Sequence, residues 1–509
     1  MCKEQWLFDS VLWLLPVITL ITGIITLFYF LGTKNYNYWT KHGVFSNTPR
    51  WPFLGNLRIS DLPKSNRDLI KGIYDSFEGR GCGGFYFLTK PVLVVRDPDL
   101  IVSILVSDFT HFSSRGFHSN EQHDPLSKNL IHLDGPPWKQ VRPKMTAAFG
   151  INKLRTMISD MDNFAAKTLE QMSKHSNINA EDLSDKFMID VVSSCLFGIN
   201  SEAIENPESA FYEVAKQIFD GYHFLVHVFV GYMFPAVHTL ARMTVARSQV
   251  THFFKKVTNE NLHLRKSEGF SQRKDFFQTL VSMKETQEIC KEDNGGSKVC
   301  DEDFIAANLF MFFSAGFDSS GKIGAFIIYE LAANKEMQTT LRDEVLRVLE
   351  KYDDKMSFEA LQEMTYLEKI VAEANRKYPI LMVIFRKCEK AYRLPDGGLI
   401  EPGINVMIPS SAIHYDPKFY PDPEKFDPER FSEENKSQRH QGSYLPFGIG
   451  PRICPAWQFA ILELKVFVAR IVSKYELDLH PSTATPMRLH PRNFLLSPES
   501  DIIVNLTKV

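Results

Sequence analysis

Apolar residues recur at helical spacing along most of this chain. The strongest pattern predicts a helix over Phe304–Leu331, with a second helix ending near Tyr352. A third helical pattern covers Phe459–Leu477, and the short alternating stretch Gly84–Pro98 predicts a β-hairpin. Because helical periods dominate, we expect one large domain that is mainly α with a small β region.

The longest apolar run is at the N-terminus. Val11–Leu31 holds 21 residues without a charge, enough to cross a bilayer core of roughly 30 Å as a helix. Lys34 and Lys41 follow it, which favours a cytosolic main body. A cleaved signal peptide is the alternative, but the sequence after the run has no small-x-small cleavage site. We therefore expect a membrane anchor at residues 1–32 and a catalytic body at residues 33–509.

The remaining breaks in the pattern are short. SNTPRWPFLGN, Ser46–Asn56, holds prolines that stop a helix and predicts a stiff hinge after the anchor. Polar loops are predicted at Lys266–Lys274 and Cys290–Asp303. Neither loop is long enough to indicate a second domain boundary.

Composition narrows the function classes. Hydrophobic residues make up 44% of the chain and include 40 phenylalanines, which indicates a large core or a pocket for apolar ligands. The formal net charge of -3 gives no electrostatic case for nucleic acid binding. Seven scattered cysteines form no CxxC pair, so a zinc cage or disulfide framework is not indicated and a reducing compartment fits.

An aromatic stretch, Phe219–Val237, contains two histidines at helical spacing. His223 and His227 are four residues apart, a spacing that suits a metal. No HExxH glutamate and no third ligand lie nearby, so an aromatic helix near membrane or core is the favoured interpretation.

One cysteine lies in an unusual loop, FGIGPRICPAW, at Phe447–Trp457. Cys454 comes just before a predicted helix, where the helix dipole and Arg452 are expected to lower the pKa of the thiol. Gly448 and Gly450 are expected to let the loop pass close to a flat object. A buried structural cysteine is the alternative. A single protein thiolate suits haem iron, because the porphyrin supplies the in-plane ligands.

The long predicted helix carries SAGFDSS, Ser314–Ser320. Asp318 lies in an apolar segment, where an unpaired carboxylate is costly. Ala315 and Gly316 leave room for a flat ring or a diatomic molecule. Ser319 can bond back to a helix carbonyl and open the helix locally. An ordinary polar stripe in a buried helix is the alternative.

Two further pairs have helical spacing. Glu373 and Arg376 are three apart and can form an ion pair, which alone is weak evidence of function. Trp138 and Arg142 are four apart and present an indole N–H and a guanidinium, both donors to carboxylates. A surface stack of arginine on tryptophan is the alternative for this second pair.

The spacing Phe447-x-x-Gly450-x-Arg452-x-Cys454 resembles the haem-binding signature of the cytochromes P450. Segments such as DPLSKNLIHLDGPPWKQVRPKM and YLPFGIGPRIC resemble insect microsomal, detoxification-type members. Ala456 departs from the family, which usually has glycine there, and is expected to tighten helix packing near the haem.

The resemblance assigns roles to residues already noted. It implies that Glu373, Arg376 and Arg430 form a buried structural triad that positions the haem loop. Asp318 and Ser319 match the acid and the alcohol of the oxygen-activation motif, with serine in place of the usual threonine. It implies Cys454 as the iron ligand and the following haem-binding residues: Trp138, Arg142, Arg386, Arg452, Phe447, Gly450, Ala315 and Gly316.

The implied function is a haem-thiolate monooxygenase with the cytochrome P450 fold, haem b and an N-terminal transmembrane helix. It is expected in the endoplasmic reticulum membrane, where NADPH–cytochrome P450 reductase supplies electrons and cytochrome b5 is a further candidate partner. Substrates are expected to be apolar small molecules. Two rivals stay open: a thiolate-haem isomerase or dehydratase, and a catalytically degenerate haem- or ligand-binding protein. A basic docking face is a further possibility, formed by Lys139, Lys144, Lys436 and Arg439.

Overall fold

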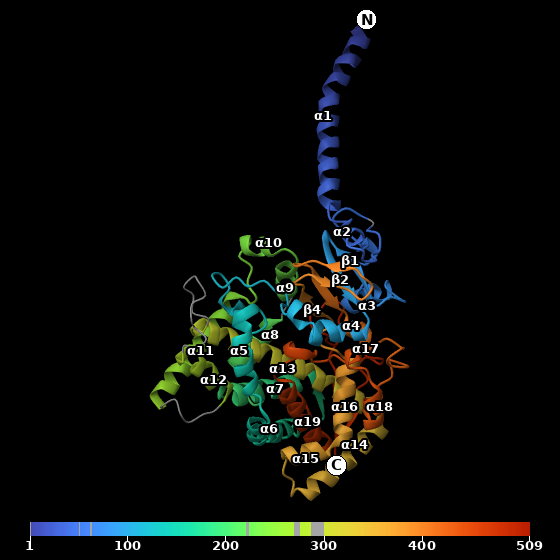
Figure 1. Ribbon diagram of the computed structural model, residues 1–509. Coiled ribbons are helices and arrows are strands. Elements are labelled where there is room, and N and C mark those ends of the chain that lie inside the picture. Colours follow the sequence, from blue (N-terminus) through green and yellow to red (C-terminus); the bar gives the residue numbers. More distant parts are fainter. Residues whose placement is uncertain (1, 50, 62–63, 220–222, 269–274, 287–299) are drawn as a thin grey trace.

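The protein consists of a helical body and one long helix that leaves it (Figure 1). The computed structural model describes residues 2–49, 51–61, 64–219, 223–268, 275–286 and 300–509. The α-helices are α1 Cys2–Thr33, α2 Tyr38–Lys41, α3 Asn66–Asp75, α4 Pro98–Val102, α5 Gly135–Ala147, α6 Ile151–Met172, α7 Ala180–Phe197, α8 Ala210–Ile218, α9 His223–Met233, α10 Pro235–Leu240, α11 Ser248–Glu268, α12 Phe276–Glu285, α13 Glu302–Ala333, α14 Lys335–Lys351, α15 Phe358–Glu363, α16 Thr365–Lys377, α17 Ser410–His414, α18 Glu433–Gln438 and α19 Trp457–Lys474.

The β part is small and lies mostly on the anchor side of the body (Figure 1). A four-stranded sheet has the order β1-β2-β7-β4, in which β1 and β2 form the predicted antiparallel hairpin and β2 runs parallel to β7. The mainly α prediction is therefore confirmed. The strands are β1 Cys82–Phe87, β2 Lys90–Val95, β3 Asn177–Asn179, β4 Ile384–Lys387, β5 Tyr392–Arg393, β6 Leu399–Ile400, β7 Asn405–Ile408, β8 Tyr475–Leu479 and β9 Ile503–Lys508.

Helix α13 crosses the centre of the body and is buried along almost all of its 32 residues. Asp301 caps it by accepting a hydrogen bond from the Phe304 N–H. Helix α7 lies directly against it, because a Cβ at Gly324 would come within 2.2 Å of the Ser184 hydroxyl oxygen. The predicted helix over 304–331 and its successor α14 are both confirmed.

The third predicted helix is shorter than expected. Helix α19 ends at Lys474, and the residues that follow form strand β8, paired antiparallel with β9 near the end of the chain. The prediction of a helix through Leu477 was therefore wrong for residues 475–477. Pairing with β9, a partner outside the local sequence, decides their conformation.

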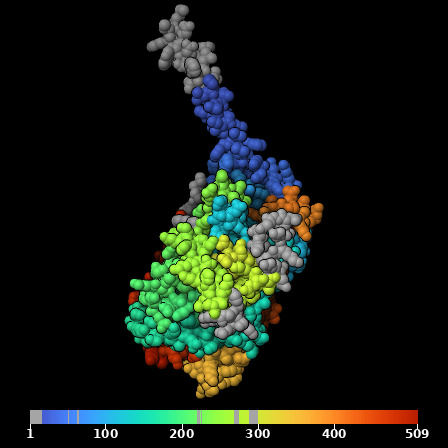
Figure 2. All heavy atoms as spheres, turned by 90° about the vertical axis from the view of Figure 1, so that its left-hand side faces the viewer, coloured from blue at the N-terminus to red at the C-terminus, as the bar shows by residue number. Residues whose placement is uncertain are grey.

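Helix α1 stands clear of the body in both views (Figures 1 and 2). Its Pro16–Thr33 segment is long and apolar enough to cross a membrane, and 6% of that window is buried. The base of the helix contacts the predicted hinge, where the rings of Phe28 and Phe53 lie 4.2 Å apart. The hinge itself is a series of turns with a bridge between Trp51 and Gly55.

Most residues of the two predicted polar loops lie outside the part of the chain that the structure describes. Residues 269–274 of the first loop and residues 290–299 of the second lie outside the described residues. The predicted aromatic stretch forms α9 and α10, with residues 220–222 again outside the described part.

Candidate functional site

A cavity of about 380 Å³ lies in the body where α13, α19, α9 and strand β4 meet. Several predicted site residues line it together: Ala315, Gly316 and Ser319 from α13, and Phe447 and Cys454 from the loop before α19. The remaining wall is largely aromatic and aliphatic. Residues distant in the sequence thus form one apolar chamber with a thiol in its wall.

The cysteine loop is held by its own backbone. The Cys454 N–H donates to the carbonyl oxygen of Phe447 at 3.0 Å, and α19 begins three residues later, as predicted. Gly450 has a φ of +76°, and a Cβ there would lie 2.0 Å from the Leu105 carbonyl oxygen. Gly450 does not line the cavity, whereas Gly448 does. Gly450 makes room for the neighbouring backbone, and its predicted role at a cofactor stays a prediction.

The thiol environment also differs from the prediction. Burial raises the pKa of Cys454, although the Ala456 N–H and the charges of Arg142 and Arg115 act in the opposite direction. The predicted lowering by the helix N-terminus is therefore outweighed by desolvation. A coordinated metal reverses this balance, because it deprotonates a thiol outright.

Four arginines line one part of the cavity wall: Arg115, Arg142, Arg386 and Arg452. Arg452 is held by Asp134, whose Oδ1 accepts from its Nη2 at 2.6 Å, and by the carbonyl oxygen of Ser113. The remaining three donate to backbone carbonyls. Asp134 attracts Arg115, Arg386 and Arg452, and Glu389 adds to the attraction on Arg452.

Burial and repulsion between neighbouring guanidiniums lower the pKa values of the arginines in this cluster. Burial, followed by repulsion from Arg452, lowers the pKa of Arg386 to about 9. Burial also lowers the pKa of Arg452 to about 10, against the attraction of Asp134. Burial and three neighbouring guanidiniums hold the pKa of Arg115 well below its usual value. The cavity wall therefore favours an anion.

Three buried donors near this wall have no partner among the described residues: Trp138 Nε1, Arg386 Nε and Arg452 Nη1. Buried N–H groups in folded proteins normally have acceptors. The two carboxylates of a haem would supply them, and Cys454 in the same cavity wall would hold its iron. The donor set thus fits haem. Arg452, rather than Arg142, stacks on Trp138, with its Cζ 4.2 Å from the ring centroid.

The two predicted catalytic residues point in different directions. Ser319 lines the cavity and donates to the Ala315 carbonyl oxygen at 2.6 Å. Asp318 does not line the cavity; it is buried and bonded to Lys322. Burial lowers the pKa of Lys322, but the charges of Asp318 and Asp185 outweigh it and raise the pKa overall. Helix α13 stays continuous here, so the predicted local opening was wrong.

The small residues of α13 serve two purposes. Ala315 faces the cavity, whereas a Cβ at Gly316 would come within 2.9 Å of the Val192 side chain. Gly316 thus permits contact with α7 as well as lining the cavity. Phe313 and Phe317 of the same helix are not part of the lining; their rings pack against each other in a tilted arrangement, with centroids 5.1 Å apart.

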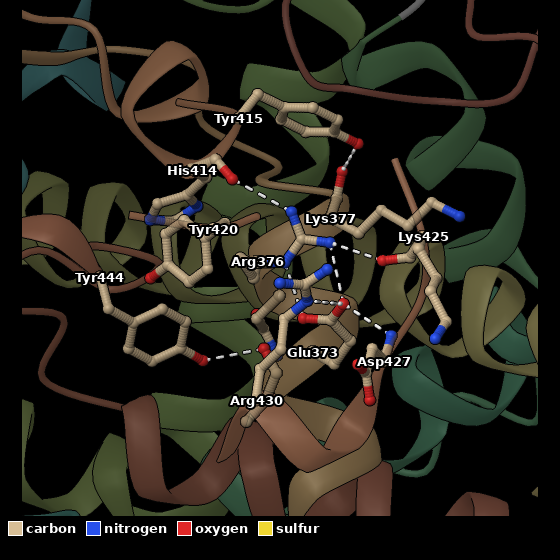
Figure 3. Close-up of polar contacts among 12 residues, drawn as sticks. Glu373, Arg376, Lys377, His414, Tyr415, Tyr420, Lys425, Asp427, Arg430 and Tyr444 are labelled. Carbon is tan, nitrogen blue, oxygen red and sulfur yellow. Dashed lines mark hydrogen bonds and ion pairs between the residues drawn. The ribbon is translucent and has the colours of Figure 1, made fainter. Parts of the chain in front are cut away.

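The three residues of the predicted charged triad lie together, with Glu373 and Arg376 fully buried and Arg430 partly exposed (Figure 3). Arg376 forms two hydrogen bonds with Glu373, at 2.7 and 2.8 Å, and both side chains have 0% exposure. Arg430 Nε lies 3.5 Å from the same carboxylate. Arg376 also donates to the carbonyl of His414, and the Asp427 N–H donates to Glu373. The triad ties α16 to two later segments of the chain.

Of the two histidines in the aromatic stretch, His223 and His227, only the second side chain can be described. The side chain of His223 lies outside what the structure describes, whereas His227 is buried in the cavity wall. Its Nδ1 lies 3.0 Å from Nε2 of His238, a hydrogen bond between two rings. Within the described ranges, no group of three or more His, Cys, Asp or Glu residues could hold a metal ion.

Sequence reasoning missed three polar members of the wall. Arg115 precedes a glycine in a loop and has no motif around it. His132 likewise lies in an irregular segment. Glu463 is buried on α19 and accepts from Ser320 Oγ at 2.5 Å, and burial raises its pKa well above the usual value. Its place as the one acidic residue of α19, between Leu462 and Leu464, was the available signal.

Comparisons with known proteins agree with this site. The family model described as Cytochrome P450 matches residues 46–505. The chain is 35% identical over 495 residues to "Probable cytochrome P450 6a13" of Drosophila melanogaster, covering 96% of this chain and 98% of that protein. It is 31% identical to cytochrome P450 6a2 of the same fly, covering 97% and 99%. It is 32% identical to cytochrome P450 9e2 of Blattella germanica, covering 93% and 94%.

The anion-favouring arginines, the cysteine in the cavity wall and the full-length likeness agree with one another. The chain therefore belongs to the cytochrome P450 family and is a P450 monooxygenase, an oxidoreductase that uses haem iron.

Proposed function

We propose that this protein is a microsomal haem-thiolate monooxygenase that inserts one oxygen atom from O₂ into apolar small molecules. The observation that carries the proposal is the shared cavity, which brings Cys454, the four arginines and Ser319 of α13 into one wall. Xenobiotics, or endogenous lipids and hormones, are the substrate classes that such an apolar chamber suits.

Haem b is the proposed cofactor, and Cys454 would hold its iron. Arg142, Arg386 and Arg452, together with Trp138, would bind its carboxylates, and Arg115 joins them from the cavity wall. Phe447, Ala315 and Gly316 would pack against the ring. When bound, the haem supplies the redox chemistry that activates dioxygen, and the protein orients and shields it.

The chain's own residues would control water and protons. The apolar wall excludes bulk water from the space beside Ser319. The Ser319 hydroxyl can release the Ala315 carbonyl and turn into the cavity as a proton donor. Behind the helix, Asp318 pairs with Lys322, which lies 4.0 Å from Glu181 near the surface. Asp318 would act as a proton relay from that side.

Replacing Ser319 with alanine is expected to reduce the fraction of NADPH electrons recovered in product by about twofold to tenfold, the effect of losing one hydrogen bond. The rest should appear as hydrogen peroxide, because proton delivery becomes less ordered. Product and peroxide per NADPH consumed are the measurements. Ser314→Ala removes another cavity hydroxyl from the same helix and is the matched control. Equal coupling in all three proteins would exclude a role for Ser319.

Electrons would come from NADPH through cytochrome P450 reductase, with cytochrome b5 as a second donor, since the sequence carries no GxGxxG strand–helix fingerprint. Of the proposed docking residues, Lys139 is exposed, Lys436 pairs with Glu433 at 3.1 Å, and Arg439 stacks on Phe431. Lys139 is therefore the stronger candidate for the docking face.

Residues 1–32 would anchor the protein in the endoplasmic reticulum membrane, with residues 33–509 as the catalytic domain facing the cytosol. The apolar Pro16–Thr33 window and the lysines after it support this orientation. Alkaline extraction of microsomes should leave the chain in the pellet, and protease added outside intact microsomes should digest the body. A protected body would reverse the orientation.

An isotope experiment separates the proposal from its rivals. With reductase, NADPH and ¹⁸O₂, a monooxygenase incorporates one labelled oxygen atom into the product. An isomerase or dehydratase converts a peroxide substrate without NADPH and without label from O₂. A degenerate haem-binding protein gives neither reaction while still binding haem. Unlabelled product formed without NADPH would overturn the monooxygenase proposal.

A further inference from the structure

His132 is a cavity residue that the proposed haem site does not use. It lies in the segment before α5 and lines the cavity beside Leu130 and Ile131. Its ring is 6.1 Å from the ring of Phe117 and 6.3 Å from that of His227. It therefore belongs to the aromatic part of the wall.

The hydrogen bonds of Asn129 fix the tautomer of this histidine. Asn129 Nδ2 donates to the Leu126 carbonyl oxygen at 2.7 Å, and its Oδ1 accepts from the N–H groups of Ile131 and His132. The amide orientation is thus set by three backbone partners. The same Oδ1 lies 3.0 Å from His132 Nδ1. Because this oxygen only accepts, Nδ1 must carry the proton.

The other ring nitrogen is then an acceptor. Burial, with added repulsion from Arg115, His238 and His118, lowers the pKa of His132 to about 4, so the ring is neutral near pH 7. In a neutral imidazole with Nδ1–H, Nε2 carries a lone pair. Within the part of the chain that is described, no side chain or backbone group donates to it.

Other polar groups of this wall are already engaged. His118 Nε2 lies 2.7 Å from the Thr239 hydroxyl, and Ser314 donates to the Met311 carbonyl. Ser319 donates to the carbonyl of Ala315. His132 Nε2 thus remains an acceptor without a donor on the aromatic part of the cavity wall, where a bound molecule can reach it.

We propose that His132 Nε2 accepts a hydrogen bond from the substrate, so that this enzyme prefers apolar molecules that carry a hydroxyl group, such as phenols and alcohols. This inference rests on the proposed function, because it names the substrate class of the same cavity. A site that bonds a hydroxyl disfavours the analogue that lacks it, since the site's polar group is then left unpaired.

The probes are 1-naphthol and 1-methoxynaphthalene, which share a ring system but differ in the hydroxyl donor. Their dissociation constants for the full-length, haem-loaded protein in detergent are measured by equilibrium dialysis. The ratio of the two constants is the readout. We expect the naphthol to bind about fivefold more tightly than its methyl ether in the wild type, the net effect of one hydrogen bond.

Two variants separate the two ring nitrogens. In His132→Asn the side-chain amide can still donate to Asn129, but the acceptor at the Nε2 position is lost. In His132→Gln the longer amide can place an oxygen near that position. The ratio should fall to about one in His132→Asn and be restored in His132→Gln. Because His132→Asn keeps the bond that holds the segment, its loss of preference reports the acceptor.

An unchanged ratio in His132→Asn overturns the inference, as does a wild-type protein that binds both probes equally. Dialysis needs neither electrons nor turnover, so these outcomes are independent of the isotope experiment. A protein that incorporates ¹⁸O but shows no naphthol preference retains the proposed function without this substrate class. A protein with the preference but no incorporation loses the monooxygenase proposal and keeps the binding site.

Discussion

Replacing Cys454 with serine is expected to remove the red-shifted carbon monoxide band of the dithionite-reduced protein and to abolish turnover. Cys454 is the cavity thiol, its backbone is fixed by the Phe447 carbonyl, and it precedes α19 directly. A serine hydroxyl has nearly the same size but does not donate the electron density of a thiolate. The measurement is the carbon monoxide difference spectrum, with product formation beside it.

The expected effect is large. Changing the outer partners of a metal ligand typically costs about 10- to 100-fold in affinity or activity, so loss of the ligand itself should exceed about 100-fold. Cys82→Ser is the matched control, because Cys82 is a half-buried thiol of strand β1 outside the cavity lining. It should leave the band intact. A wild-type band that survives in Cys454→Ser would mean that another group is the ligand.

Replacing Arg376 with methionine is expected to lower the free energy of unfolding by about 3–5 kcal/mol, because it leaves the Glu373 carboxylate buried without its main partner. Both side chains are fully buried and joined by two hydrogen bonds. Arg430 at 3.5 Å cannot replace that geometry. Urea unfolding followed by tryptophan fluorescence measures the loss.

An exposed pair provides the control. Lys216 and Glu213 have the same three-residue spacing, 2.9 Å apart, with about half of each side chain exposed. Lys216→Met should change stability by less than about 1 kcal/mol. Combining Arg376→Met with Glu373→Leu should recover part of the loss, since no buried charge remains. A double variant less stable than Arg376→Met alone would contradict this account.

Hydrophobic periodicity predicted which helices and strands form better than it predicted the residues at which they end. The long helix α13 was evident because its apolar residues continue for eight turns, and the β1–β2 hairpin because its residues alternate. The end of α19 could not be predicted, since Tyr475–Leu479 become a strand only by pairing with β9, about 30 residues later. The residues around Tyr475–Leu479 do not by themselves indicate that β9 will pair with them.

Site residues were likewise easier to predict when they lie in a recognisable motif than when they lie in an irregular segment. Cys454 was identified from the Phe447-x-x-Gly450-x-Arg452-x-Cys454 spacing, although its loop is irregular, and Trp138 and Arg142 from their four-residue spacing on α5. Asp318 and Ser319 are adjacent in the motif, but Asp318 turns away to Lys322 while Ser319 lines the cavity. The sequence motif alone does not show this difference in direction. Arg115 and His132 lie in irregular segments, whose course is set by contacts such as those of Asn129.

The four cavity arginines have a consequence beyond catalysis. A fold that confines four guanidiniums in one buried wall, where they lower each other's pKa, is less favourable on its own than with an added dianion. Any ligand that binds only the folded chain stabilises it in proportion to the logarithm of the ligand's concentration. The haem-loaded protein should therefore have a higher free energy of unfolding than the haem-free chain.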